Sequence, residues 1–223
     1  MKRALLAAAL FTIAAANPVF ADTLEATAGV STLGEGLSFS APLAPGMLNL
    51  VVGFNHYTGH RSGVYTDSSG DSIPYDADAR LQSIPVLLNF FPFHGVFRIT
   101  GGIVYNENQL DAIGDSSSGS YTFNGQTYSS AAVGTLSGNV RFRRYAPYLG
   151  IGFGDTLNSQ GLSAGLDVGV LFQGSPQVSL QASNPTGNPT LAQDVADAQA
   201  QANQKASSYK YYPVIGLHLG YSF

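Results

Sequence analysis

The sequence predicts an all-β fold: an eight-stranded antiparallel transmembrane up-and-down β-barrel with long extracellular loops, one of them carrying a short helix. Large apolar residues alternate with glycines and small polar residues along several segments, as they do in strands. No stretch after Ala21 reaches the roughly twenty apolar residues of a transmembrane helix. The chain also ends on an aromatic residue, Phe223, whereas the termini of soluble domains are usually polar and frayed.

Composition leaves two classes open, a secreted β-sandwich and an outer-membrane β-barrel. Charged residues make up 11% of the chain, below the roughly 25% typical of soluble domains, and glycine accounts for 26 of 223 residues. The chain contains no cysteine, so disulfides and cysteine-based zinc sites are excluded. We expect neither a metal nor a cofactor.

Residues 1–21 have the plan of a secretory signal peptide. Two basic residues, Lys2 and Arg3, precede an apolar run, and the small residue Ala21 ends the segment. The sequence therefore predicts cleavage after Ala21 and a barrel over residues 22–223. Without residues 1–21, eight basic residues remain beside fourteen acidic ones, a net charge of −6, and no nucleic-acid partner is expected at that charge.

The first three strands are expected before residue 58. Residues 24–41 read as two short strands joined by a tight turn near residues 32–36, because small and apolar residues alternate on both sides of the turn. Residues 47–57 alternate clearly: leucines, Val52 and Phe54 share one face, and asparagines and a glycine share the other. This period of two is the strand signature.

Two further strands follow in the middle of the chain. Residues 80–91 alternate less cleanly, and Pro85 predicts an irregular hydrogen-bond ladder there. Residues 97–106 place isoleucines and aromatics on one face, with Arg98 and Thr100 on the other. A charge on an otherwise small polar face already suggests that this face is enclosed.

The last three strands show the pattern most clearly. Residues 145–154 alternate apolar residues with Tyr148 and glycines, and residues 161–173 alternate leucines and valines with glycines and Asp167. The closing run, residues 210–223, sets leucines and aromatics against glycines and His218. Surface strands of a sandwich usually expose Lys, Glu and Thr to water. Glycines and isolated charges instead indicate a cramped polar lumen, with lipid on the apolar side.

Connection lengths alternate, as they do in bacterial barrels. Residues 42–46, 92–96 and 155–160 are short, and residues 60–79, 107–143 and 174–210 are long. Short periplasmic turns and long external loops with both termini in the periplasm require an even number of strands. Aromatic residues fall near the strand ends, where membrane-interface girdles belong.

Two of the long loops carry structure of their own. Asn124-Gly125 is a strong two-residue hairpin signal, so the barrel wall is expected to extend above the membrane as a ribbon. In residues 190–206, Thr190 and Gln193 match a capping box and apolar residues follow at helical spacing. We expect a short helix over the barrel mouth; the alternative is a disordered polar loop.

Three stretches together resemble the CarO-type small outer-membrane barrels: residues 123–154, 170–206 and 209–223. The motifs APYLG, GSP and TGNPTLAQD carry the likeness, which is strongest after Tyr121. The family is described as ornithine or basic-amino-acid uptake porins, and some members are linked to carbapenem entry. The resemblance implies a barrel in the outer membrane and supplies no residue-level substrate site.

Tyr221 and Phe223 are expected to form the terminal signal that the barrel assembly machinery recognises. The match is partial, because the glycine usual five residues from the end is replaced by His218. Outer-membrane lipid and lipopolysaccharide are the expected surroundings of what we predict to be a monomer.

Four inward residues form the candidate lumen site: Glu25, Arg98, Asp167 and His218. Opposite charges in a low-dielectric lumen need partners, so we expect Arg98 to pair with Asp167 or Glu25, with His218 nearby. One interpretation is a structural plug. The other is a polar path for small cationic or zwitterionic, amino-acid-like solutes, helped by acidic external loops that concentrate cations.

Two other classes of function are alternatives to solute passage. The first is a structural or adhesive barrel that acts through its external loops. The second is a lipid-modifying enzyme, for which His56 or His60 with Ser62, Asp67 or Ser68 could be imagined. No catalytic residue is assigned.

Overall fold

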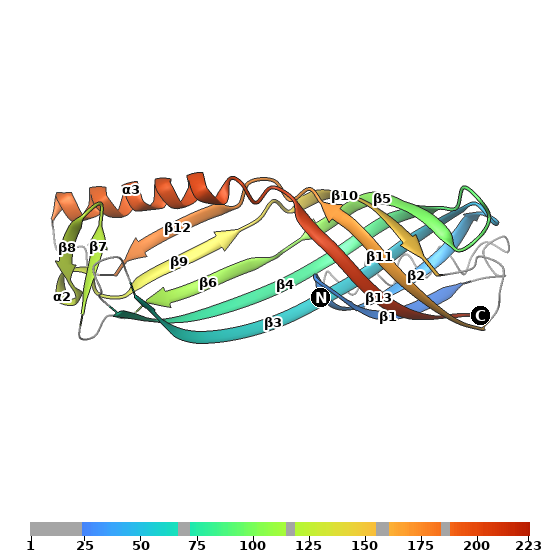
Figure 1. Cartoon of the computed structure of the whole chain (residues 1–223), viewed down its shortest axis with the longest axis horizontal. Helices are drawn as coiled ribbons and strands as arrows, with labels where there is room; N and C mark the ends of the chain where they lie inside the picture. The colour runs from blue at the N-terminus through green and yellow to red at the C-terminus, as the bar shows by residue number, and fades with distance from the viewer. Residues whose placement is uncertain (1–23, 67–71, 115–118, 155–160, 184–187) are drawn as a thin grey trace, which may run out of the picture.

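The structure is a computed structural model that describes residues 24–66, 72–114, 119–154, 161–183 and 188–223. The predicted signal peptide and the predicted turn at residues 155–160 lie outside these residues. Eight strands close into an antiparallel barrel in the order β1-β2-β3-β4-β5-β10-β11-β13, and β13 pairs with β1 (Figure 1). The strands are β1 (Glu25–Ser31), β2 (Gly34–Ala44), β3 (Leu48–Thr66), β4 (Ser72–Phe90), β5 (Phe97–Asn106), β10 (Tyr145–Phe153), β11 (Gly161–Leu171) and β13 (Tyr212–Ser222).

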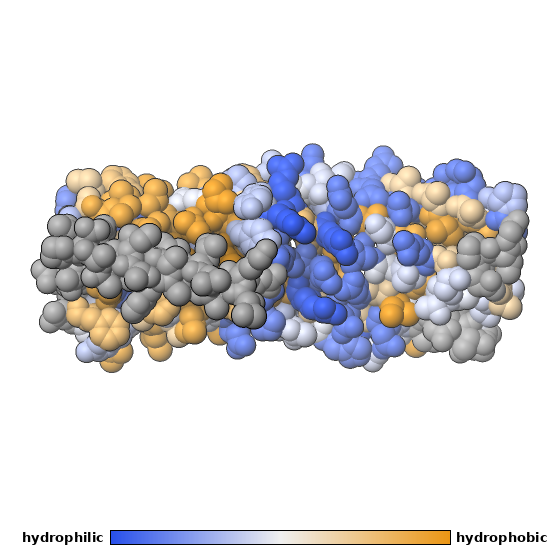
Figure 2. Space-filling view, turned by 180° about the vertical axis from the view of Figure 1, so that it is seen from behind, coloured by the Kyte–Doolittle hydropathy of each residue, from blue (hydrophilic) through white to orange (hydrophobic). Residues whose placement is uncertain are grey.

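The predicted strand count and alternation are confirmed. Along β10, exposed and buried residues alternate without a break: Leu149, Ile151 and Phe153 point outward with 42–56% of their surface exposed. Tyr148 and the glycines between them point into the lumen. The apolar outer belt appears as one end of the molecule in Figure 2. No helix among the described residues combines the length and apolar character needed to cross a bilayer.

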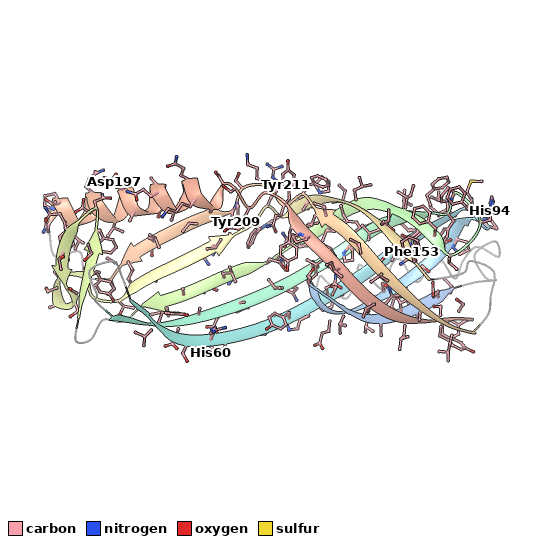
Figure 3. All side chains as sticks on the ribbon, viewed as in Figure 1. His60, His94, Phe153, Asp197, Tyr209 and Tyr211 are labelled. Atoms are coloured by element: carbon pink, nitrogen blue, oxygen red, sulfur yellow. The ribbon has the colours of Figure 1, made fainter. Side chains whose placement is uncertain are left out.

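Aromatic pairs mark both ends of the belt. At one end Phe97 and Phe153 lie with ring centroids 5.2 Å apart. At the other end Tyr105 faces Tyr145 at 5.4 Å, and Phe172 faces Tyr211 at 5.6 Å. Phe153 and Tyr211 stand at opposite ends of the belt in Figure 3. Aromatic residues at both ends of the membrane-spanning strands are what interface girdles on either side of a bilayer consist of.

The irregular ladder predicted at Pro85 is present. The pairing of β3 with β4 is interrupted there, between Val52 opposite Val86 and Asn55 opposite Ser83, and resumes in the same register. A shift in register occurs in β2, between Pro42 and Ala44.

The barrel wall continues far beyond the membrane. β3 and β4 are 19 residues long, about twice the roughly 9–11 residues that cross a bilayer. Their outer halves join β6 (Gln109–Gly114), β9 (Leu136–Arg141) and β12 (Gln177–Ala182) in an extracellular sheet. The expectation that residues 60–79 form a long loop is therefore wrong. These strands carry polar residues on their outer face because water, not lipid, surrounds them, so the sequence lacks the apolar alternation there.

The predicted hairpin turn is present, but it does not extend the wall. β7 (Ser120–Phe123) and β8 (Gln126–Ser129) form a separate two-stranded sheet. Asn124 and Gly125 both have positive φ, 51° and 79°, as a type I′ turn demands. The short helix α2 (Ser130–Val133) follows this hairpin at the far end of the molecule (Figure 1).

The predicted helix is confirmed as α3 (Pro189–Ala206). Its N-cap is Asn188, whose side chain accepts from the Thr190 amide at 3.0 Å, so the proposed Thr190–Gln193 capping box is wrong. α3 also runs beside β12 along the long axis instead of across the mouth (Figure 1). It packs there on an extracellular core of five buried residues: Tyr121, Phe123, Val133, Leu191 and Val195.

Polar contacts fasten the hairpin to α3. Asn124 at the turn accepts from Gln201 Nε2 at 2.8 Å, and Asn124 Nδ2 donates to Asp194 Oδ1 at 3.3 Å. The Tyr128 hydroxyl donates to Asp194, and this hydrogen bond raises the pKa of Tyr128 to about 12. The hairpin, α3 and the sheet thus form one packed extracellular unit.

Candidate functional site

The lumen contains a charge pair whose geometry depends on a glycine. Arg98 on β5 and Asp167 on β11 are both paired with Gly152 on the strand between them, β10. Arg98 Nη2 donates to Asp167 Oδ1 at 2.7 Å. A Cβ at position 152 would lie 2.5 Å from Arg98 Nε and 2.7 Å from Asp167 Oδ1. Only glycine leaves room for the guanidinium to cross the strand.

His218 extends this pair to a third strand. Its Nδ1 lies 3.1 Å from Asp167 Oδ2, so the carboxylate bridges a guanidinium and an imidazole. The side chain of Arg98 is 3% exposed, His218 14% and Asp167 27%. The imidazole lies over Gly165, where a Cβ would overlap the ring. A buried ion pair is retained at such a site when its hydrogen bonds are satisfied from several sides.

Glu25 is separate from this network. Its two carboxylate oxygens accept from Ser163 Oγ at 2.7 Å and Ser40 Oγ at 3.2 Å. It lies opposite Ser222 on β13, four residues along that strand from His218. Among the described residues, no cationic side chain lies within 4.0 Å of Glu25. One lumen carboxylate therefore has hydroxyl donors but no counter-ion in this part of the chain.

A cavity of about 170 Å³ connects these groups. Glu25, Arg98, Asp167 and His218 all line it. Serine, threonine and asparagine residues of β1 to β5 form its remaining polar wall, and Thr100 donates to Asn89 at 2.8 Å within it. At roughly 30 Å³ per molecule, this volume corresponds to about six waters. The lumen thus contains a small space with charged, polar and apolar walls and not a porin-sized channel.

An apolar layer fills the lumen at its external end. Its centre is Leu33, which stands in the two-residue turn between β1 and β2 and is only 5% exposed. We call the buried set around it the roof; it consists of Leu33, Val104, Ala146, Tyr148, Leu171 and Val214, with Leu87 and Tyr212 packed against it. These residues come from five different places around the barrel, so the roof spans the lumen.

The turn that carries Leu33 is fastened to β13. Thr32 N donates to Ile215 O at 3.0 Å, and Thr32 Oγ1 donates to Pro213 O at 2.9 Å. The Tyr212 hydroxyl donates to Thr32 O at 2.6 Å. Gly34, which follows Leu33, has φ of +109°, a conformation that favours glycine. The turn is therefore held inward by several hydrogen bonds.

The fold is shared with two solved structures. The crystal structure of Acinetobacter baumannii CarO2 matches with a TM-score of 0.58 at 22% identity, over 91% of this chain and 99% of that one. The Acinetobacter baumannii CarO structure matches at 0.54 with 21% identity, over 93% and 100%. The chain has the CarO-type barrel fold. A scan of family models and a search of curated protein sequences each found no match.

Within this CarO-type barrel, the structure separates the four predicted lumen residues into two groups. Arg98, Asp167 and His218 are together, and Asp167 is the carboxylate beside Arg98. Glu25 lies apart, with two serines. Tyr148 fills space left by inward glycines: a Cβ at Gly150 would lie 2.5 Å from its hydroxyl.

The roof was missed by sequence reasoning. Residues 32–36 were interpreted only as a tight turn, although Leu33 is a large apolar residue in a place where polar or small residues are usual. The available signal in the sequence was its apolar character, because an apolar side chain in a turn above a lumen must either face water or fold inward.

The external acidic residues are largely engaged. His60 Nδ1 lies 2.9 Å from Asp78 Oδ1 on the outer face of the extracellular sheet. This hydrogen bond and the charge of Asp78 raise the pKa of His60 above its usual value of 6.5. Asp111 accepts from Gln109 and Asn139, and Asp194 from Tyr128. These contacts join strands to one another and the hairpin to α3. The acidic residues therefore have a structural role in addition to any electrostatic attraction of cations.

The histidines imagined for an enzyme contact different polar partners, and Ser62 lies opposite Asp76 of β4. His56 lies 3.2 Å from Thr58 Oγ1 on an exposed surface, whereas His60 is bound to Asp78. Asp67 and Ser68 lie outside the described residues. Among those described, no group of three or more His, Cys, Asp or Glu side chains is placed to hold a metal ion.

Proposed function

We propose that this protein is an outer-membrane β-barrel that assists the passage of small cationic or zwitterionic solutes such as basic amino acids. The closed barrel, its apolar belt and the two aromatic girdles support residence in a bilayer. Outer-membrane lipid and lipopolysaccharide are then its surroundings. The C-terminal Tyr221 and Phe223, whose rings lie 5.1 Å apart, would be presented to the assembly machinery.

The observation that carries the solute class is the position of Glu25. Arg98 and Asp167 neutralise each other, which leaves Glu25 as a carboxylate in the cavity wall whose donors, among the described residues, are two serines. In a low-dielectric space a carboxylate favours a cationic partner. An ammonium group that enters the cavity would meet this charge.

Passage requires that the roof moves. Leu33 and its neighbours fill the external end, so a solute crosses only when the β1–β2 turn swings away from β13. A gated, slow path fits this arrangement better than a permanently open pore. The hydrogen bonds of Thr32 and Tyr212 are the contacts that such an opening would break.

Uptake into proteoliposomes tests the proposal. We expect radiolabelled arginine to enter vesicles that contain the protein faster than glutamate does, and Glu25→Gln to abolish this preference. Glu35→Gln is the matched control, because Glu35 is an exposed residue of the same hairpin, opposite His56. Equal uptake of both amino acids by the wild type, or a preference unchanged in Glu25→Gln, would contradict the proposal.

A structural or adhesive barrel is the second candidate. The observation that favours it is the extracellular unit, which has its own buried core and a helix docked on the sheet. Such a role predicts that purified wild-type protein binds cells or surfaces without transporting solutes. Absence of uptake by correctly folded protein, combined with binding by the extracellular unit, would favour this candidate.

A further inference from the structure

Five basic residues form a band at the external edge of the apolar belt. We call this set the basic band; it consists of Arg80, Arg141, Arg143, Arg144 and Lys210, all exposed. It contains five of the eight basic residues that follow residue 21. Figure 2 shows strongly hydrophilic side chains gathered beside the apolar end of the molecule. The clustering is notable because acidic residues outnumber basic ones in this chain.

Strand register places two of these residues on one face. Arg80 on β4 lies opposite Gln109 on β6, which lies opposite Arg141 on β9. Residues opposite one another share a face, and two strand spacings separate the arginines by about 10 Å. Arg80 has the same parity as the outward-facing Val86 and Leu88 on β4, so this face continues the lipid-facing wall.

The other three residues stand next to the external girdle. Arg143 and Arg144 directly precede Tyr145, and Lys210 directly precedes Tyr211. Tyr145 and Tyr211 are both ring-paired girdle residues, and Tyr211 is labelled at this level in Figure 3. The basic band therefore lies where lipid headgroups meet the protein.

Nearby carboxylates are occupied elsewhere. Asp78, two residues from Arg80, is bound to His60, and Asp111 accepts from Gln109 and Asn139. Within the described residues, the basic band makes no ion pair with a carboxylate. Five exposed cations that make no ion pair in the described part of the chain, at a headgroup level, form a site for anionic groups.

We propose that the basic band binds the phosphate groups of a phosphorylated glycolipid in the outer leaflet. Arginine forks match phosphate oxygens bidentately, while the girdle and the apolar belt below contact the acyl chains. The inference rests on the membrane location proposed above, and it is independent of solute passage. It assigns the outer-leaflet contact to one side of the barrel, from β4 through β10 to β13.

Lipid binding in detergent tests the inference directly. Native mass spectrometry would compare diphosphorylated lipid A with the same lipid freed of phosphate. We expect the triple variant Arg141→Gln/Arg143→Gln/Arg144→Gln to bind diphosphorylated lipid A at least about tenfold more weakly than the wild type. Arg61→Gln/Lys205→Gln, which changes two exposed cations away from the girdle, is the control and should bind like the wild type.

Three results would overturn the inference. One is equal affinity of the wild type for the lipid with and without phosphate, since only apolar contact would then operate. Another is unchanged binding by the triple variant. The third is complete competition by inorganic phosphate, which would indicate an anion site unrelated to the membrane. Arginine uptake can be measured in vesicles that lack this lipid, so its outcome does not depend on lipid binding. A failure of the solute-passage proposal can therefore be distinguished from a failure of the lipid-binding inference.

Discussion

At the residue scale, the charge network of the lumen depends on glycines that leave room for its side chains. Gly152 and Gly165 lie beneath Arg98 and His218, and a methyl group at either position would overlap the side chain above it. These glycines allow Asp167 to contact both the guanidinium of Arg98 and the imidazole of His218. The charge network is thus encoded jointly by the charges and by the glycines between them.

Gly152→Ala should therefore separate Arg98 from Asp167. Breaking a buried ion pair costs about 3–5 kcal/mol, and we expect a loss near the lower end because Asp167 is 27% exposed. Urea unfolding in detergent micelles would measure it. Gly101→Ala is the control, since a Cβ there meets its nearest atom only at 3.8 Å. Equal stability of the two variants would contradict the role of Gly152.

His60 gives a pH-dependent prediction outside the membrane. Asp78 raises the pKa of His60 in the folded protein, so the stabilisation from protonated His60 is fully present below pH 6.5 and is lost as pH rises through the raised folded pKa. In an NMR titration, Asp78→Asn should return the imidazole toward its ordinary pKa. An unchanged titration curve in this variant would rule out the pair.

The sequence identified the inward residues at this scale but not all their partners. Alternation is sufficient to place Arg98, Asp167 and Glu25 on the lumen face, because each strand has a period of two. Which carboxylate lies beside Arg98 depends on the stagger of three strands around a closed barrel, and that stagger is a property of the whole sheet. Leu33 was missed for a related reason: its environment is created by strands far from it in sequence.

At the element scale, α3 protects an open sheet edge. Among the described strands β12 pairs with β9 alone, and unpaired edge groups invite association with other strands. Asn203 of α3 accepts from Val178 N at 2.8 Å and donates to Val178 O at 2.8 Å, while Gln199 accepts from Leu180 N at 2.8 Å. The side-chain amides of Gln199 and Asn203 are one helical turn apart on α3, and the backbone groups of Val178 and Leu180 are two residues apart on β12. The rise of one helical turn is close to that of two strand residues, so both amides reach the edge.

Asn203→Leu should expose this edge. Leaving Val178 without its side-chain partner is expected to cost about 1–3 kcal/mol and to accelerate hydrogen exchange of the Val178 amide. Gln204→Leu, an exposed change one residue along the helix, is the control. Exchange at Val178 that is equal in both variants would show that α3 does not protect β12.

Helix and hairpin were predictable because their signals are local. The asparagine–glycine turn and the helical spacing of Leu191 and Val195 lie within short windows. The outer halves of β3 and β4 were not predictable in the same way. There the outer face carries His60 and Asp78 in water, and this polar pattern resembles a loop when read without its partner strands.

At the scale of the whole molecule, one continuous wall of strands is in contact with lipid along one part and with water along the other. The same strands β3 and β4 cross the bilayer and then enter water, and their outer residues change from apolar to polar at the basic band. The lumen changes in the opposite sense, from a cavity that contains the ionisable residues to the apolar roof at its external end. We therefore expect a barrel that is closed at rest and opens by movement of the β1–β2 turn.

Planar-bilayer conductance of Leu33→Ala tests this central claim most directly. Truncating Leu33 removes the centre of the roof, so we predict frequent openings in Leu33→Ala and rare ones in the wild type. Leu37→Ala, an outward residue of the same hairpin with 62% exposure, should behave like the wild type. Equal conductance of folded Leu33→Ala and wild-type protein would contradict the gated lumen.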